Sequence, residues 1–477
     1  MLSSVLWIAL SRIVLGLTPL LTLPALTEGL SPEWYGVWAQ IATTLSFVVP
    51  LVGMGLDTAV IRYFATGFAD EKRVRDFYSM GVFLAAIALG FLAIAAVGSR
   101  FLGSLMFSKP DLATYSVLAF IWVLIQGIYN YAISFFRVTG RMRTYAVLDA
   151  ANGLTAAFVM VFIPLRYHSV ALMLEGLMAG HAMFALAFLL FIYRQLGFSG
   201  ISFKGIGKYL KYGLPLVPNS LFLWLVNSSG RYFLTHYRGL AEVGVYAAGF
   251  TIANVMTLFF MPISFVLFPV ISKLWEEGRK DKVAAMVALA NQWYLILAIP
   301  GALGLSFLAE PIVGLLSAKE FSGGVEVIFW LALANLFYGL YQINLYGTLL
   351  LQKNIRLTGL FALAGILNVG LNLALIPTLG NQGAAIGMLI SFLFLAGMVF
   401  LWARRALGFH RDWAVNFKVL LSALMMLAAL WLWRSRYPIK GALTLAGTIM
   451  LAAVVYALLL LASRAVRIDD LKNISKK

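Results

Sequence analysis

Apolar residues recur along the chain in continuous runs of about 20, and short segments between the runs carry most of the charge. An apolar run of that length spans roughly 30 Å of hydrocarbon as an α-helix. A strand of a membrane β-barrel alternates apolar with polar residues, and these runs do not. The pattern therefore predicts an all-α polytopic membrane protein with fourteen transmembrane helices, near residues 5–26, 35–60, 77–98, 113–136, 145–165, 170–192, 212–234, 244–272, 284–307, 325–350, 357–378, 383–403, 417–433 and 441–462.

The junctions between the predicted helices are too short to hold a folded domain outside the membrane. The longest are about twenty residues, at 194–211 and 308–325. The first run, 5–26, is too long for the core of a signal peptide and has no small-residue cleavage site, so we expect no cleavable signal. Function must therefore lie inside the helix bundle or at its mouths.

Composition supports the membrane assignment. Hydrophobic residues make up 62% of the 477 positions, charged residues only 12%, and the mean hydropathy is +0.91. A soluble domain is about a quarter charged, because its surface must face water. The chain has no cysteine, which excludes disulfides and thiol chemistry.

The net charge of +17 follows the predicted membrane topology. The two termini and the junctions after even-numbered helices hold 26 Lys and Arg, and the opposite junctions hold nine. By the positive-inside rule, this difference places both termini in the cytoplasm. We therefore expect a multi-pass membrane protein and no binding of nucleic acid.

Weak matches in one register indicate an internal repeat. Residues 36–39 (GVWA) have a counterpart 208 positions later at 244–247 (GVYA). The fourth and tenth helices share a glutamine and a basic end, Gln126 with Arg137 and Gln342 with Lys353, at an offset of 216. Coincidence between hydrophobic sequences is the alternative explanation.

The repeat predicts the domain organisation. An even number of helices separates the copies, so both halves have the same orientation, as in transporters with a substrate site between two parallel repeats. We expect a six-helix lobe at residues 1–205 and a second at 206–410. Residues 411–477 then form helices 13 and 14 and a cytoplasmic tail.

Charged side chains inside spanning helices cost roughly 2.5–3.5 kcal/mol at mid-membrane, so each needs a reason. Arg12, Arg62 and Arg231 lie in or at the end of predicted spans. A guanidinium group offers two parallel donors that match phosphate oxygens, which favours a phosphate or pyrophosphate site. The alternative is an arginine that extends to the interface.

Acidic groups are candidates for ion coupling. Asp57, Asp149 and Glu175 all lie in predicted helices. Glu175 and His181 would titrate if buried, but they are six residues apart and do not share a helix face. Asp149 lies close to Arg141, and the alternative for it is a solvated carboxylate at a helix start.

Uncharged polar residues form stripes that must face other helices or a wet cavity. They are expected to line a cavity that binds sugar hydroxyls, and the alternative is hydrogen bonding between helices. The candidate cavity residues are Gln126, Asn130, Asn219, Asn227, Asn335, Tyr338, Gln342, Asn368 and Asn372.

Sequence motifs of catalysis and nucleotide binding are missing. The chain has four histidines, and it contains no HExxH motif, no P-loop and no nucleophile elbow. We expect no enzyme activity, no metal site and no cofactor. Energy would then come from an ion gradient, the membrane potential or the substrate gradient.

Several segments resemble the Wzx-type oligosaccharide-lipid flippases of the multidrug/oligosaccharidyl-lipid/polysaccharide exporter superfamily. They are GMGLDTAVIRYF (53–64), KYGLPLVPNSL (211–221), GRYFL (230–234), GLAEVGVYAAGFTIANV (239–255) and FPVISKLWEEG (268–278). The resemblance covers about residues 1–405. It departs from the family pattern at Gly230, where members often have Asp, and in having two further helices.

The resemblance implies two six-helix lobes in a V, a cationic central cavity and alternating access. The implied cargo is an undecaprenyl-pyrophosphate-linked oligosaccharide, such as an O-antigen or other surface-polysaccharide repeat unit. It would move from the cytoplasmic to the periplasmic leaflet. The family's arginine in the second helix matches Arg62, and its Arg-Tyr pair after the seventh helix matches Arg231-Tyr232.

Other functions stay open at this stage. The additional helix pair is similar to lipid II flippases, which carry a peptidoglycan precursor. A drug/cation antiporter would favour acidic cavity residues, and a membrane glycosyltransferase usually needs a large outer loop. Expected partners are the lipid-linked oligosaccharide, the bilayer and the polysaccharide polymerase or chain-length machinery, and we expect a monomer.

Overall fold

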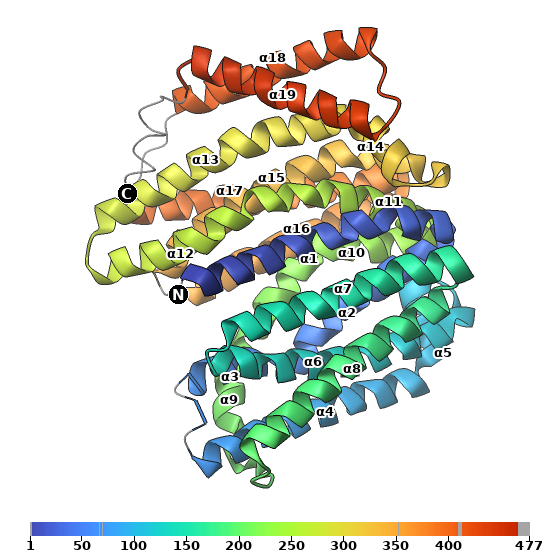
Figure 1. Ribbon diagram of the computed structural model, residues 1–477, viewed down its shortest axis with the longest axis vertical. Coiled ribbons are helices and arrows are strands. Elements are labelled where there is room, and N and C mark those ends of the chain that lie inside the picture. The colour runs from blue at the N-terminus through green and yellow to red at the C-terminus, as the bar shows by residue number, and fades with distance from the viewer. Residues whose placement is uncertain (1, 66, 69, 352, 409–412, 466–477) are drawn as a thin grey trace. The chain divides into compact units, whose positions relative to one another are not determined.

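A computed structural model describes residues 2–65, 67–68, 70–351, 353–408 and 413–465, without the side chains of residues 2–10, 12, 13, 265 and 354. Across these ranges the secondary structure is helical (Figure 1). The longer helices are α1 (Leu2–Gly29), α2 (Pro32–Gly53), α4 (Glu71–Val97), α6 (Ala113–Val138), α7 (Met142–Tyr167), α8 (Val170–Leu196), α10 (Val217–Arg238), α13 (Lys280–Phe307), α15 (Val325–Leu349), α16 (Asn354–Leu379), α17 (Asn381–Leu407), α18 (Trp413–Arg436) and α19 (Ala442–Ala462).

Shorter helices and 3-10 turns lie between them. They are α3 (Leu56–Tyr63), α5 (Ser99–Phe107), η1 (Pro110–Leu112), η2 (Phe203–Gly205), α9 (Ile206–Gly213), η3 (Leu214–Leu216), α11 (Leu240–Ala253), η4 (Asn254–Phe259), α12 (Met261–Glu276), α14 (Ala309–Leu316) and η5 (Lys319–Gly324).

The all-α membrane class is confirmed. Within the described ranges, twelve helical segments are long and apolar enough to cross a membrane. They fall on twelve of the fourteen predicted spans. The other two predicted spans, 5–26 and 212–234, are helical in α1 and α10, but their described parts do not reach the same length and hydropathy. The count of fourteen therefore stays a prediction.

Two helices that were predicted to be continuous are broken. Met54, with φ of 46°, and Gly55, with φ of 68°, separate α2 from α3. The 3-10 turn η4 separates α11 from α12, and Pro262 follows in the first turn of α12. The predictions of single helices at 35–60 and 244–272 were wrong. Apolar residues continue across both breaks, so hydropathy gives no sign of them, whereas the regular α-helical backbone conformation is interrupted there.

Element order supports the internal repeat. After α4 come the short helix α5, the turn η1 and the long helix α6. The same sequence of elements recurs as α13, α14, η5 and α15. A short helix and a 3-10 turn therefore occupy corresponding places in the two halves of the chain, where the sequence analysis expected only short junctions between helices.

Contacts between junctions fit helices that alternate in direction. Lys109 pairs with Glu33, and His168 Nδ1 donates to Gly29 O over 3.0 Å. Arg434 Nη2 lies 2.6 Å from Glu310 Oε2. All of these residues belong to junctions after odd-numbered predicted helices, which should lie on one side of the membrane. Which side faces the cytoplasm stays a prediction.

The chain forms two compact units. Unit 1 comprises Met1–Ala247 and Phe361–Gly380, and unit 2 comprises Ala248–Leu360 and Asn381–Lys477. Most of helix α16, from Phe361 onward, is thus the part of the later chain that packs into unit 1. The predicted division into lobes at residues 205 and 410 stays a prediction.

Two glycines bring α2 and α11 into backbone contact within unit 1. A Cβ added at Gly36 would lie 2.0 Å from Leu240 O, and one added at Gly244 would lie 2.0 Å from Pro32 O. Residues 32 and 240, like 36 and 244, are 208 positions apart, which is the offset of the repeat. The matched segments 32–36 and 240–244 therefore make the same contact on each other, as residues do around a twofold axis.

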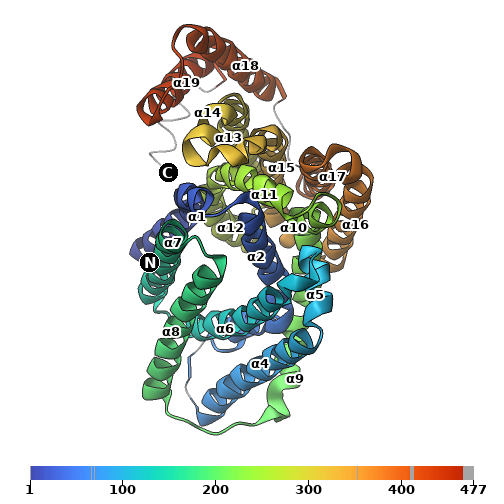
Figure 2. The same ribbon diagram turned by 90° about the vertical axis from the view of Figure 1, so that its right-hand side faces the viewer.

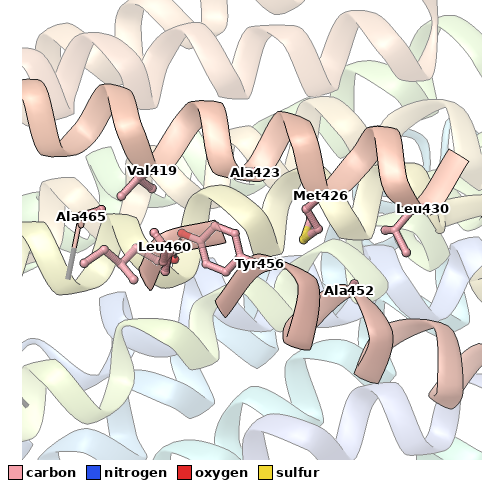
Figure 3. Close-up of a cluster of buried hydrophobic side chains, with 9 residues drawn as sticks. Val419, Ala423, Met426, Leu430, Ala452, Tyr456, Leu460 and Ala465 are labelled. Carbon is pink, nitrogen blue, oxygen red and sulfur yellow. Dashed lines mark hydrogen bonds between the residues drawn. The ribbon is translucent and has the colours of Figure 1, made fainter. Parts of the chain in front are cut away.

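In unit 2, α18 and α19 form a hairpin that packs on α13 (Figure 3). The buried surface includes Val419, Ala423 and Met426 from α18, with Tyr456 and Leu460 from α19. Tyr456 Oη donates to Ile296 O over 2.8 Å, which satisfies the hydroxyl in an apolar setting. The last two predicted helices are therefore packed parts of the fold.

Candidate functional site

A cavity of about 260 Å³ lies at the break between α2 and α3 in unit 1. Its walls come from the α2 end, the start of α3, α6 and the start of α10. The polar side chains in its lining are Asp57, Thr58, Asn130, Tyr131 and Ser220. Irregular backbone at membrane depth is tolerated where it lines a cavity, and transporter sites form at such helix breaks.

Two glycines allow the backbones at this cavity to meet. A Cβ at Gly55 would lie 2.5 Å from Gly213 O, and a Cβ at Gly213 would lie 2.5 Å from Met54 O. Gly55 also has a positive φ that other residues adopt at a cost. The break after α2 is therefore packed directly against the turn that leads from α9 into α10.

A second, shallower and more open cavity of about 390 Å³ lies between α2 and α6. Ser46 and Gln126 line it, and the rings of Trp38 and Trp122 stack beside it with centroids 5.6 Å apart. Val49 and Pro50 of α2 belong to the linings of both cavities. The two cavities are therefore neighbours along α2.

The predicted polar stripe on α6 connects the two cavities. Gln126 Nε2 donates to Asn130 Oδ1 over 3.0 Å, and the two residues line different cavities. Both residues of the stripe therefore lie in cavity linings, and their role in binding sugar hydroxyls stays a prediction. Ser134, one turn further on, is buried and donates to Tyr131 O over 2.6 Å.

Arg62 lies on α3, about one turn beyond the cavity residue Thr58. Its guanidinium carbon is 4.4 Å from the ring centroid of Tyr212 and 5.9 Å from that of Tyr63. The side chain is exposed, so its donors are accessible. A cation stacked on aromatic rings keeps its N–H groups free to point outward in the ring plane.

Arg231 makes a hydrogen bond to a neighbouring helix of unit 1. Its Nη1 donates to Thr43 Oγ1 on α2 over 2.8 Å. The neighbouring Tyr232 shares a 2.7 Å hydrogen bond with Thr44, and Trp224 Nε1 donates to Thr43 O over 3.1 Å. These bonds join α10 to α2. Arg12 lies in α1, but its side chain is outside the described residues.

The sequence analysis missed the α2 side of this network. Thr43, Thr44 and Ser46 are common helix residues, and only packing shows that they face α10. Gln40, one turn earlier, has 0% exposure, and neither atom of its amide has a hydrogen-bond partner in the described part of the chain. Its burial without a partner costs stability, since amides strongly prefer to be bonded.

The predicted asparagines of α16 form a buried cluster with α10. Ser229 Oγ donates to Asn368 Oδ1 over 3.1 Å, and Asn372 Nδ2 donates to the same oxygen over 2.8 Å. All three residues are less than 5% exposed. Asn227 donates to Leu223 O of its own helix over 3.0 Å, and Asn219 is partly buried in the first turn of α10. The cluster joins two helices of unit 1.

The predicted residues of α15 lie in unit 2. Asn335 Nδ2 donates to Ala253 O over 3.2 Å, and Gln342 Nε2 donates to Tyr338 Oη over 3.0 Å. The sequence analysis missed a reciprocal amide pair nearby, in which Asn291 and Asn344 each donate to the other over 3.1 and 2.9 Å. The bonds of Asn335 and of the Asn291–Asn344 pair connect helices, which is the alternative that the stripe pattern left open, whereas the Gln342–Tyr338 bond lies within α15.

The three candidate coupling residues lie in different settings. Asp57 is exposed at the 260 Å³ cavity. Asp149 accepts a 3.3 Å hydrogen bond from Tyr129, and Glu175 is exposed on α8. His181 is buried and donates to Leu177 O over 2.8 Å, so it and Glu175 lie on different faces, as expected. The described residues contain no cluster of three metal-ligand side chains.

Comparison with known proteins gives one family. The family model described as polysaccharide biosynthesis protein matches residues 1–275. The chain is 24% identical to a Haemophilus influenzae protein of the Lsg locus, covering 64% of this chain and 74% of that protein. It is 22% identical to the probable low-salt glycan biosynthesis flippase Agl15 of Haloferax volcanii, covering 68% of this chain and 69% of Agl15.

Solved structures with the same fold are transporters. The lipid II flippase MurJ in an inward closed conformation superposes with a TM-score of 0.79 at 14% identity, over 97% of this chain and 99% of MurJ. An inward-facing multidrug transporter of the MATE family gives a TM-score of 0.63 at 14% identity, over 84% of this chain and 98% of that protein.

Proposed function

Since this chain belongs to the polysaccharide biosynthesis protein family, we propose that it is a flippase for undecaprenyl-pyrophosphate-linked oligosaccharides. It carries repeat units of O-antigen or another surface polysaccharide from the cytoplasmic to the periplasmic leaflet. It lies in the bacterial inner membrane with fourteen spans and both termini in the cytoplasm. It works as a monomer and supplies repeat units to a polysaccharide polymerase and its chain-length machinery.

The observation that carries this proposal is the pair of adjoining cavities along α2. Their polar lining is mostly uncharged: Ser46, Gln126, Asn130, Thr58 and Ser220. Hydroxyl and amide groups can donate to sugar hydroxyls and accept from them. The cavities also hold large apolar and aromatic surfaces, which suit the faces of sugar rings.

Arg62 is proposed to bind the pyrophosphate. It is exposed one turn from the cavity, and its fork of donors matches phosphate oxygens. Arg231 and Arg12 are proposed to act in the same cationic path. The hydrogen bond from Arg231 to Thr43 would have to be exchanged for a phosphate contact during transport.

Movement between leaflets is proposed to occur by alternating access of two lobes, residues 1–205 and 206–410. The broken helices support this mechanism, because unwound segments are places where backbone can change conformation at low cost. The last two predicted helices, α18 and α19, pack on α13 and would move with the second lobe.

Transport of lipid II is the second candidate. The fold likeness to MurJ extends over 97% of the chain, including the last two helices. The mechanism would be the same, and only the sugars and the peptide of the substrate would differ. A drug antiporter is less well supported, because Asp57 is the one acidic side chain among the described residues that line the two α2 cavities.

Complementation distinguishes the candidates. The full chain would be expressed in bacterial strains that lack their own flippase and whose lipid-linked glycans are known. We expect surface polysaccharide to return in at least one strain deficient in O-antigen or capsule transport. Rescue only of a strain that lacks the lipid II flippase would contradict the proposed substrate and support the second candidate.

Replacement of Asp57 tests ion coupling. Asp57 lines the cavity, whereas Glu175 is exposed elsewhere on α8. If a proton on Asp57 drives transport, Asp57→Asn fixes the neutral state and should flatten the dependence of flipping rate on external pH. Flipping would be measured with a labelled lipid-linked oligosaccharide in proteoliposomes.

The matched variant for this test is Glu175→Gln, which removes the same charge from a helix outside the cavity lining. Its pH profile should follow that of the wild type. A flat profile in Glu175→Gln, together with an unchanged profile in Asp57→Asn, would move the coupling site to α8.

A further inference from the structure

The segment that joins α8 to α10, residues 198–214, has an unusual outer surface. Four large apolar side chains are between 46% and 59% exposed: Phe198, Ile201, Phe203 and Leu214. Three exposed lysines, Lys204, Lys208 and Lys211, lie between Phe203 and Leu214 in the chain. We call these seven side chains the linker surface.

The inner face of the segment is firmly packed within unit 1. Ile206, Tyr209 and Gly213 of α9 are buried at helical spacing, and α9 contacts α3 and α4. Tyr209 Oη donates to Asp76 Oδ2 over 2.9 Å, and Ser202 N donates to Ser79 Oγ over 2.8 Å. Figure 1 shows α9 beside α3, and Figure 2 shows it beside α4. These contacts hold the segment in place while the side chains of the linker surface stay exposed.

The Tyr209 phenol stays protonated and can therefore donate a hydrogen bond. Burial, together with the carboxylate of Asp76, raises the pKa of Tyr209 above its ordinary value, so the phenol stays protonated. It can then donate to Asp76 at any physiological pH. Asp76 is thereby engaged on the inner face of α9, while the linker surface faces outward.

The linker surface carries only positive charge. Residues 198–214 contain three lysines and no acidic residue. Lys208 Nζ lies 4.5 Å from the ring centroid of Tyr63, which positions it without neutralising it. A surface that combines exposed aromatic and aliphatic side chains with lysines fits the boundary between headgroups and acyl chains.

The place of the segment in the chain sets its depth. It joins the end of α8 to the start of α10, so it lies where predicted spans leave the membrane. Apolar side chains there can enter the acyl region while the lysines reach the headgroups. Both kinds of side chain are exposed on this one segment.

We propose that the linker surface binds anionic phospholipid headgroups of the bilayer leaflet. The lysines supply the charge contact, and Phe198, Ile201, Phe203 and Leu214 supply the apolar contact. This role is separate from the transported substrate and requires only that α8 and α10 cross the membrane.

Binding of labelled phosphatidylglycerol to the detergent-solubilised full chain tests the proposal, with phosphatidylcholine carrying the same label as the reference lipid. The wild type should prefer phosphatidylglycerol. The variant K204Q/K208Q/K211Q should lose most of that preference, on the order of a hundredfold in relative affinity at low salt. Added salt should weaken the wild-type preference, because the contacts are at the surface.

The matched control is K273Q/K280Q/K282Q. It removes the same charge from the α12–α13 junction, where Glu276, Glu277 and Asp281 lie among the lysines. This control and the charge-preserving K204R/K208R/K211R should both keep the wild-type preference. An unchanged preference in K204Q/K208Q/K211Q, or an equal loss in the control, would overturn the proposal.

Complementation keeps this result distinct from the proposed transport function. K204Q/K208Q/K211Q that has lost lipid preference but restores surface polysaccharide supports a lipid site separate from the substrate. Lipid preference in the wild type without any complementation would contradict the flippase proposal alone.

Discussion

Alanine at Gly36 is expected to destabilise the protein by about 2 kcal/mol, because the new Cβ would lie 2.0 Å from Leu240 O. A backbone oxygen cannot rotate aside, so α2 and α11 must separate. The helix propensity that alanine gains recovers at most about 1 kcal/mol of this loss. Unfolding titrations from mild detergent into sodium dodecyl sulfate would measure the free energy of unfolding.

Gly244→Ala should cost a similar amount, since its Cβ would lie 2.0 Å from Pro32 O. The double variant should cost less than the sum of the two, because the first alanine already separates the backbones that the second would strain. Strict additivity would show that the two contacts are independent and would contradict the reciprocal packing described here.

Gly90 of α4 is the matched control for these variants. A Cβ at Gly90 meets nothing within 4 Å. Gly90→Ala should therefore leave stability unchanged or raise it by up to about 1 kcal/mol through helix propensity alone. A loss at Gly90 as large as that at Gly36 would mean that glycine is needed for a reason other than close approach.

Arg62→Gln should slow flipping by roughly tenfold to a hundredfold while insertion and stability stay at the wild-type level. The side chain is exposed, so its loss leaves no buried group without a partner. Its proposed contact with pyrophosphate is a charged, two-pronged hydrogen bond that glutamine cannot replace. Flipping of a labelled lipid-linked oligosaccharide in proteoliposomes gives the rate.

Two further variants interpret that result. Arg62→Lys keeps the charge but loses the planar fork, so its rate should fall between those of the wild type and Arg62→Gln. Arg141→Gln removes another exposed arginine that lies over a ring, 5.5 Å from the centroid of Phe191, outside the lining of either α2 cavity. Equal losses in Arg62→Gln and Arg141→Gln would indicate a general effect of surface charge.

Several features could be predicted from the sequence because they depend on local composition. An apolar run of about 20 residues has few stable structures in a bilayer other than a helix, so most of the long helices lie close to their predicted positions. The predicted spans 35–60 and 244–272 are the exceptions, because each contains a break. The match between residues 36–39 and 244–247 indicated the repeat. The stripe at Gln126 and Asn130 indicated a cavity on α6.

Only the tertiary structure decided which polar residues meet. Thr43 gave no signal in the sequence, yet it accepts from Arg231 on a helix almost 190 positions away. The breaks at Met54 and at η4 were invisible because apolar residues continue through them. In the sequence, Gly36 was one identical residue in a short match with residues 244–247. Its role in letting α2 and α11 approach closely became clear only from the position of its backbone against Leu240 O. Hydropathy determines how deep a residue lies in the membrane, whereas the partner across the bundle depends on how the helices rotate and cross.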